Sequence, residues 1–184
     1  SVYEPDPLPN LRNRRTIYAE KLRGLRDPFM EAFNQPGSDA SCELRESSTV
    51  APQALTLLNT EEVQDRALAF AARLLKERKS DPAVIKRAFE LALSRPATKN
   101  EVDACITRWK SAEKSENEKK PVHPSFPRKI KRTVMAEKTG EPYDFWEYLP
   151  ASESYQPDLQ RSQTDARTRG LAHVCLVLFN SNEF

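Results

Sequence analysis

Apolar residues recur every three or four positions in three consecutive stretches of the chain. The first stretch runs from Val63 to about Arg78, the second ends at Pro96, and the third fades into the charged run from Glu113 to Lys120. This spacing places the apolar side chains on one face of an α-helix. The stripes are Val63, Ala67, Phe70, Ala71, Leu74 and Leu75, then Ile85, Ala88, Phe89 and Ala92, and then Val102, Cys105, Ile106 and Trp109. The pattern predicts three amphipathic helices.

Polar residues and prolines mark the starts of these helices. A shorter helix is expected to begin near Pro52, with Leu55 and Leu58 on its apolar face. Two residue pairs have the spacing of a capping box, and a third combines an acidic N-cap with a proline at the first helical position. The pairs are Asn59 with Glu62, Thr98 with Glu101, and Asp81 with Pro82.

The last apolar segment differs from the others. A helix is expected from Asp165 to Asn180, and its second half, Leu171 to Phe179, is apolar on nearly every side. Such a helix is buried by neighbours on several faces. The sequence therefore predicts an all-α (mainly α) fold in which the helices form a compact bundle around this segment.

The remaining segments predict the domain organisation. Residues 1–47 are rich in proline and polar residues and are expected to form an extended, loop-rich lead-in that packs on the bundle. The bundle core comprises residues 48–120 and 164–184. Residues 121–163 are expected to be an insertion with a short basic helix, in which Ile130 and Val134 lie one turn apart, followed by an acidic and aromatic loop.

Composition narrows the classes of function. The chain has 184 residues and a formal net charge of +2, so a strongly basic nucleic-acid coat is excluded and no nucleic-acid partner is expected. The longest apolar runs fall short of the roughly 18 residues that a membrane-spanning helix needs. The first residue is Ser1 and no leader pattern follows it, so the chain is expected to be a fragment of a longer protein.

Few residues of the chain are suited to metal binding or catalysis. Cys42, Cys105 and Cys175 are far apart, and no CxxC or CxxCH motif occurs. The histidines, His123 and His173, match no known metal or catalytic motif. The sequence thus predicts no metal site, no cofactor and no catalytic residue in this chain, and it leaves open whether Cys42 is free or paired.

One polar segment is a candidate binding site. Residues 42–49 place Glu43, Arg45, Glu46 and Thr49 just before the predicted helix at Pro52, where backbone N–H groups attract an anion. The alternative is that Ser48 or Thr49 only caps that helix.

The predicted insertion is a second candidate. Tyr143, Trp146 and Tyr155 could stack on sugar rings, or they could hold the insertion against the domain. The basic residues from Arg128 to Arg132 could bind phosphate, or they could form a solvated helix face.

Five ordered blocks of the chain resemble the planctomycete C-terminal domain of unknown function, family 1553. These blocks are Arg14–Tyr18, Pro28–Phe33, Cys42–Asn59, Arg87–Pro96 and Leu176–Phe184, and the resemblance spans roughly residues 12–184. Among the matching residues that are not plainly core, Arg14, Arg15 and Gln53 join Arg45 and Thr49 as candidate binding residues.

The resemblance implies a position within a larger protein. Such domains close exported, multidomain bacterial proteins, downstream of another domain of unknown function and often of a cytochrome c-like module. It therefore implies an extracytoplasmic location. The fragment-like ends, the missing catalytic motifs and the near-neutral charge predict a non-catalytic docking module, whose partners are upstream domains of the same polypeptide and, beyond them, a polysaccharide or redox partner. Any haem would belong to a partner domain. Two alternatives stay open: part of a hydrolase site that uses Glu43, Arg45 and Glu46 with the aromatic insertion, and a carbohydrate-binding module.

Overall fold

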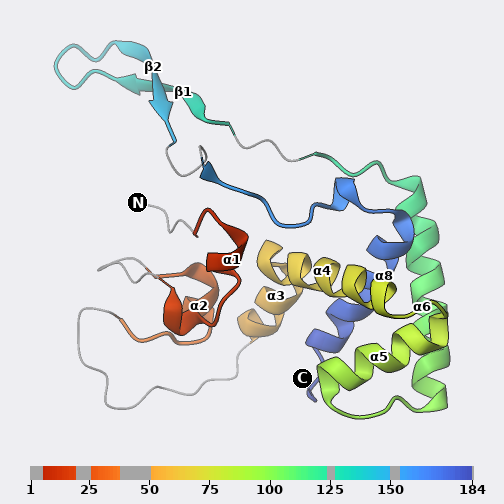
Figure 1. Ribbon diagram of the computed structural model, residues 1–184. Coiled ribbons are helices and arrows are strands. Elements are labelled where there is room, and N and C mark those ends of the chain that lie inside the picture. The colour runs from red at the N-terminus through yellow and green to blue at the C-terminus, as the bar shows by residue number, and fades with distance from the viewer. Residues whose placement is uncertain (1–5, 20–25, 38–50, 124–126, 150–153, 184) are drawn as a thin grey trace. The chain divides into compact units, whose positions relative to one another are not determined.

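The computed structural model describes residues 6–19, 26–37, 51–123, 127–149 and 154–183, and these are mainly helical with one small sheet (Figure 1). The mainly helical class predicted from the sequence is confirmed. The chain divides into two units, which are described one at a time. Residues 1–25 and 124–158 form the first unit, and residues 26–123 and 159–184 form the second.

The second unit contains the helices that the apolar stripes predict. Its elements are α2 (Pro28–Ala32), α3 (Ala51–Asn59), α4 (Glu61–Glu77), α5 (Asp81–Leu93), α6 (Lys99–Glu118), the 3-10 helix η2 (Arg161–Gln163) and α8 (Ala166–Phe179). Asp165 caps α8 by accepting a hydrogen bond from Thr168 N at 2.8 Å. The predicted helices starting near Pro52, Val63, Asp81, Thr98 and Asp165 are all present.

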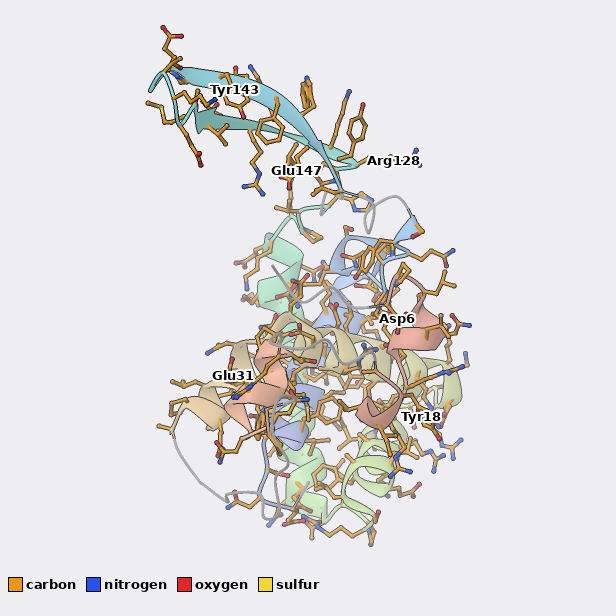
Figure 2. All side chains as sticks on the ribbon, turned by 90° about the vertical axis from the view of Figure 1, so that its left-hand side faces the viewer. Asp6, Tyr18, Glu31, Arg128, Tyr143 and Glu147 are labelled. Atoms are coloured by element: carbon orange, nitrogen blue, oxygen red, sulfur yellow. The ribbon has the colours of Figure 1, made fainter. Side chains whose placement is uncertain are left out.

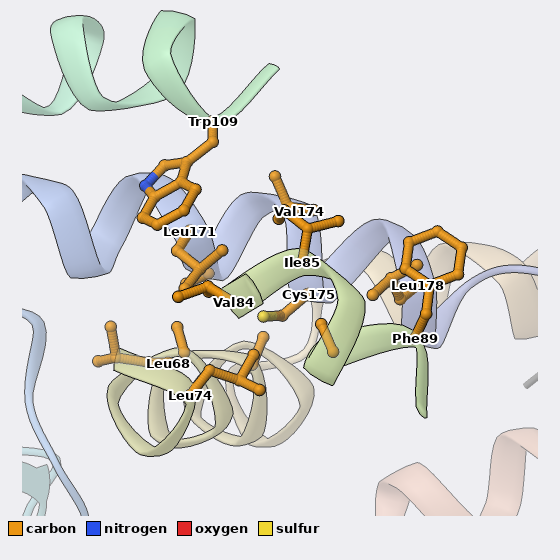
Figure 3. Packing of buried hydrophobic residues seen from close by; sticks show 14 of the residues in the cluster. Leu68, Leu74, Val84, Ile85, Phe89, Trp109, Leu171, Val174, Cys175 and Leu178 are labelled. Carbon is orange, nitrogen blue, oxygen red and sulfur yellow. The ribbon is translucent and has the colours of Figure 1, made fainter. Parts of the chain in front are cut away.

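The core of this unit is built around α8, which packs against α4, α5 and α6. Figure 3 shows Leu68 and Leu74 of α4, Ile85 of α5 and Trp109 of α6 facing α8 residues such as Leu171 and Cys175. The indole N–H of Trp109 donates to the carbonyl of Arg167 at 2.9 Å, so the one polar atom of this buried ring has a partner. Burial of Cys175 raises the pKa of its thiol. The prediction that α8 is the most buried segment agrees with this packing.

A glycine sets the close approach of α8 to α6. A Cβ atom at Gly170 would lie 2.7 Å from the backbone nitrogen of Glu113. Because real Cβ contacts are not that short, only glycine fits at this crossing without displacing one of the helices.

Of the three predicted N-terminal caps, one formed as expected. Thr98 Oγ1 accepts from Glu101 N at 3.3 Å while the Glu101 carboxylate accepts from Thr98 N at 2.7 Å, which is the predicted capping box. The predicted capping box of Asn59 with Glu62 is wrong. Asn59 is the last residue of α3, and Thr60 takes the N-cap position but donates its hydroxyl hydrogen to Thr56 O at 2.9 Å.

The predicted N-cap at Asp81 is shifted by one residue. Ser80 occupies the N-cap position, and Asp81 is the first residue of α5. The Asp81 carboxylate binds Arg167 at 2.6 Å instead of the helix backbone. A long-range ion pair has therefore replaced the local cap, while Pro82 still lies in the first turn as predicted.

The first unit contains α1 (Pro9–Arg12), the 3-10 helix η1 (Thr16–Tyr18) and the strands β1 (Lys129–Met135) and β2 (Pro142–Tyr148). Arg12 joins its two chain segments. Its guanidinium donates to Asp158 at 3.0 Å and to Gln156 O at 2.5 Å, and it lies 4.7 Å from the centre of the Tyr155 ring. Charge, hydrogen bonding and cation–π attraction at one side chain thus hold the segments together.

The predicted basic helix around Ile130 and Val134 is wrong, and so is the predicted acidic and aromatic loop. Both segments are strands of an antiparallel hairpin (Figure 1). A spacing of four residues fits both one helical turn and two strand repeats, so Ile130 and Val134 share a face in either structure. β-Branched residues in β1 and aromatic residues in β2 favour strands. Gly140, at φ 69°, supplies the left-handed backbone of the turn.

Candidate functional site

The pairing of β1 with β2 sorts the hairpin side chains into two faces. Residues directly opposite each other in an antiparallel pair point to the same side of the sheet. Val134 is paired with Tyr143 and Arg132 with Phe145, so these belong to one face. The other face holds the paired residues Lys129 with Tyr148 and Lys131 with Trp146, and further along it Thr133 with Asp144 and Met135 with Pro142.

The first face is apolar at its centre. Tyr143 and Phe145 lie with their ring centroids 6.1 Å apart, next to the half-buried Val134. At one end of this face Arg132 Nε donates to Glu147 at 2.6 Å. Figure 2 shows Tyr143 and Glu147 along the length of β2. The face therefore combines an aromatic pair with a cross-strand ion pair.

The second face is aromatic and cationic. Trp146 is 54% exposed and Tyr148 is 72% exposed. The Lys129 ammonium lies 4.8 Å from the centre of the Trp146 ring, within cation–π range. Lys131 binds Asp144 at 2.6 Å, and hydrogen bonds from Lys131 and from Thr133 lower the pKa of the Asp144 carboxyl group. We call the part of this face that is formed by Lys129, Lys131, Trp146 and Tyr148 the tryptophan face.

The three predicted aromatic site residues are not brought together. Tyr143 and Trp146 are three residues apart on one strand, so they point to opposite faces of the hairpin. Tyr155 lies beyond the hairpin and is covered by Arg12. Trp146 shares its face with Tyr148, and Tyr143 shares the other face with Phe145. The sequence analysis missed Tyr148, although the alternation of residues 146 and 148 would have revealed it had the segment been recognised as a strand.

The other predicted binding residues fall into two groups. Arg14 and Arg15 are exposed, and Arg14 donates to Asn10 O at 3.2 Å, while Gln53 is half-buried in α3. The remaining predicted residues, together with Cys42, lie outside the residues that the structure describes; they are Glu43, Arg45, Glu46 and Thr49.

The sequence analysis also missed a buried charge cluster in the second unit. The Glu116 carboxylate, only 2% exposed, contacts Arg161 at 2.7 Å, Arg169 at 3.0 Å and His173 at 3.2 Å, and Lys119 lies 3.4 Å away. Burial alone would raise the pKa of Glu116, but the hydrogen bond to His173 and the attraction of the arginines lower it to about 2. We call these five residues the Glu116 cluster.

A second network of ion pairs and hydrogen bonds connects sequence blocks that resemble the family. Arg95 donates to Glu101 at 2.7 Å and to Glu183 at 2.6 Å. The hydrogen bonds from Arg95 and Thr98 lower the pKa of Glu101 to about 2. Asn180 donates to the carbonyl of Leu57 at 3.4 Å, which links α8 to α3. Arg95, Asn180 and Glu183, which belong to these blocks, therefore bind other residues of the second unit.

The electrostatics of the described residues do not favour acid catalysis. Wherever a carboxyl group has a resolved change in pKa, the pKa is lowered. A carboxyl group that acts as a general acid at neutral pH needs a raised pKa. Within the described ranges no three His, Cys, Asp or Glu side chains are grouped so as to hold a metal ion, and no helix is long and apolar enough to cross a membrane.

Comparison with known protein families gives a match. The model of the family PSD1, a protein of unknown function (DUF1553), matches residues 3–109, more than half of the chain. The chain belongs to the DUF1553 family. No curated protein and no solved structure matches it. The resemblance to family 1553 predicted from the sequence is thus confirmed.

The DUF1553 match covers only part of the structure just described. It ends at Trp109 within α6, so the hairpin and α8 lie beyond the matched residues. The proposed correspondence of the block Leu176–Phe184 to this family therefore stays a prediction. Because the family is one of unknown function, the match names no reaction, and the function must be inferred from the site.

Proposed function

We propose that this chain is a non-catalytic docking module of a larger exported bacterial protein. In this proposal α4, α5, α6 and α8 form a helical bundle that serves as a scaffold, and the hairpin provides the contact surface. The partner is an upstream domain of the same polypeptide, beside a cytochrome c-like or glycan-handling module. The extracytoplasmic location and the module types follow from what the family resemblance implies.

The observation that supports docking best is the exposure of the tryptophan face. Two large rings that are more than half exposed expose apolar surface to water, and Trp and Tyr are the residues most often found at the energetic centre of interfaces. A two-stranded hairpin is also only marginally stable by itself, so a partner that covers one face would stabilise it. Lys129 adds a positive charge beside Trp146 that an acidic partner surface would complement, whereas Lys131 is already paired with Asp144.

The two tryptophans of the chain allow a direct test. Trp109 is 1% exposed and Trp146 is 54% exposed, so a collisional quencher such as acrylamide reaches Trp146 in the free chain. Adding the separately purified upstream domains of the polypeptide should protect Trp146 from quenching. The variant W146F, which retains only Trp109, should show no such change.

A matched pair of variants shows which face of the hairpin binds the upstream domains. W146A/Y148A should weaken binding of the upstream domains by at least about tenfold, as loss of a central aromatic anchor does. Y143A/F145A removes two rings from the other face and should have the smaller effect. Docking by this surface would be wrong if quenching of Trp146 were unchanged at saturating upstream domain.

Carbohydrate binding is a second candidate, and one observation favours it. Trp146 and Tyr148 lie two residues apart on the same face, which is an arrangement on which neighbouring sugar rings can stack. A soluble neutral oligosaccharide would then protect Trp146 from acrylamide in the absence of any protein partner. Protection by the upstream domains alone would favour docking.

A further inference from the structure

The second unit contains an open cleft of about 530 Å³ where the C-terminal end of α4 meets the segment that leads into α8. This volume is in the range of ordinary small-molecule sites. The cleft is lined by apolar side chains, polar side chains and four cationic ones. The side chains used below are Leu75, Leu159, Gln163, Thr164 and Asp165, together with the cations Lys76, Arg78, Lys79 and Arg167.

Three of the cations lack an acidic partner among the described residues. No described carboxylate lies within 4 Å of Lys76, Arg78 or Lys79. The nearest acid in sequence, Glu77, binds Arg73 at 2.7 Å and Arg87 at 2.9 Å, and hydrogen bonds from these two arginines lower the pKa of its carboxyl group. The charge of Glu77 is therefore committed to other residues, and the positive charge along the cleft is left uncompensated.

The fourth cation, Arg167, is held in place. Its guanidinium lies 4.6 Å from the centre of the buried Trp109 ring, and one of its nitrogens donates to Asp81 at 2.6 Å. A guanidinium has five N–H donors in a fixed plane, so this ion pair leaves several of them available to a ligand. Packing and pairing thus orient the group before any ligand arrives, which lowers the entropic cost of binding.

One carboxylate also lines the cleft, but its charge has a local role. Asp165 caps α8, accepting hydrogen bonds from the backbone and side chain of Thr168, and these bonds lower its pKa. The remaining walls suit a polar ligand with one apolar surface. Gln163 and Thr164 supply polar groups, and Leu75 and Leu159 supply an apolar surface.

We propose that this cleft binds a sugar-sized ligand that carries a tetrahedral oxyanion, as a sulfate ester or a phosphate ester. Lys76, Arg78 and Lys79 neutralise the anion, and Arg167 donates to its oxygens in a fixed direction. The hydroxyl groups of the ligand meet Gln163 and Thr164, and its less polar surface meets Leu75 and Leu159. The cleft uses no residue of the hairpin, so this proposal stands or falls independently of docking.

The test is calorimetric titration of the full chain with four probes: glucose 6-phosphate, glucose 6-sulfate, glucuronate and glucose. One or both esters should bind, with glucose at least about tenfold weaker because it offers the cations no charge-assisted hydrogen bond. Glucuronate should bind more weakly than the esters because its planar carboxylate offers two oxygens to the cations where a tetrahedral group offers three. The ester that binds more tightly shows whether the cleft prefers a phosphate ester or a sulfate ester. Glucuronate binding as tightly as the esters would overturn the assignment of a tetrahedral group.

Two variants with equal charge changes locate the site. K76Q/R78Q/K79Q removes three cations from the cleft, and K86Q/K110Q/K114Q removes three exposed lysines from α5 and α6. Ester affinity should fall by at least about tenfold in the first variant and change less than about twofold in the second. Equal weakening in both would show general charge attraction and overturn the proposal, as would unchanged affinity in the first. Circular dichroism spectra of both variants check that they are folded.

Discussion

The Glu116 cluster and the cleft at the end of α4 are both rich in cationic side chains, yet they differ in one respect. In the Glu116 cluster a carboxylate that is 2% exposed pairs directly with the arginines around it, with contacts of 2.7 and 3.0 Å. At the cleft the nearest acid in the sequence, Glu77, pairs instead with Arg73 and Arg87. The cations of the cluster therefore have an acidic partner within the fold, whereas three cations of the cleft have none among the described residues.

This difference predicts which charges stabilise the fold and which are available to bind a ligand. Removing the charge of the buried Glu116 carboxylate costs free energy, because the buried Arg169 is then left without compensation. An exposed cation without a partner costs almost nothing to remove. Neutralising a charge should therefore destabilise the protein at Glu116 and leave it stable at the cleft, where a ligand would be lost instead.

The largest effect is expected for E116Q. Glutamine keeps the shape of the side chain but removes the charge that Arg161 and Arg169 share, so the free energy of unfolding should fall by about 3–5 kcal/mol. Urea denaturation measures this change. E118Q, an exposed position on the same helix, is the matched control and should change stability by less than about 0.5 kcal/mol. Equal stabilities of the two variants would contradict a structural role for Glu116.

The next largest effect is expected for G170A. The added methyl group would meet the Glu113 backbone at 2.7 Å, so α8 and α6 must separate, at a cost of about 1–3 kcal/mol. Because α6 carries Glu116 and α8 carries Arg169, separation should also weaken their ion pair. G37A meets the end of the flexible Arg26 side chain at 3.1 Å and should cost less. Thermal unfolding distinguishes the two, and a larger loss in G37A would refute the close-approach argument.

The pH dependence of stability provides a smaller and more specific signal. The pKa of Glu116 is about 2 in the folded chain, well below the ordinary glutamate value of 4.5, so the folded state favours the deprotonated form. The resulting stability is present above about pH 4.5 and is lost as the pH falls through 2. The difference in unfolding free energy between the wild type and E116Q should therefore shrink between pH 5 and pH 2, as measured by urea titration. A difference that stays constant over this range would be inconsistent with the low pKa.

The smallest effect on stability is expected for K76Q/R78Q/K79Q. All three side chains are exposed and none has an acidic partner among the described residues, so the unfolding free energy should change by less than about 0.5 kcal/mol. Urea denaturation beside the K86Q/K110Q/K114Q control checks this. A loss of 2 kcal/mol or more, on the order expected for a buried network, would place the cleft cations with the Glu116 cluster.

The sequence predicts the helical core well because its periodicity is local. The stripes at three- and four-residue spacing and the capping box at Thr98 depend on neighbours within one or two turns. The hairpin was mistaken for a helix and a loop because the Ile130–Val134 spacing fits both periods. Only the pairing with β2 settles that choice, and this pairing is not visible in β1 alone.

The candidate sites were harder to predict, since they are assembled from residues far apart in the chain. Glu116 meets Arg169 across 53 positions, and Arg167 meets Asp81 across 86. The sequence does contain one usable signal for the cleft: three cations among the four residues Lys76 to Lys79 at the end of a predicted helix. What it could not show is that Glu77, inside this run, is committed to Arg73 and Arg87.

The contrast between the two charged regions can be tested in one measurement, the change in melting temperature when the tighter-binding ester is added. A ligand that binds only the folded state raises the melting temperature according to its concentration relative to its Kd. We predict that the wild type and E116Q, which starts from a lower melting temperature, both show this rise, while K76Q/R78Q/K79Q melts like the wild type but does not respond. A full response in the cleft variant would contradict the account.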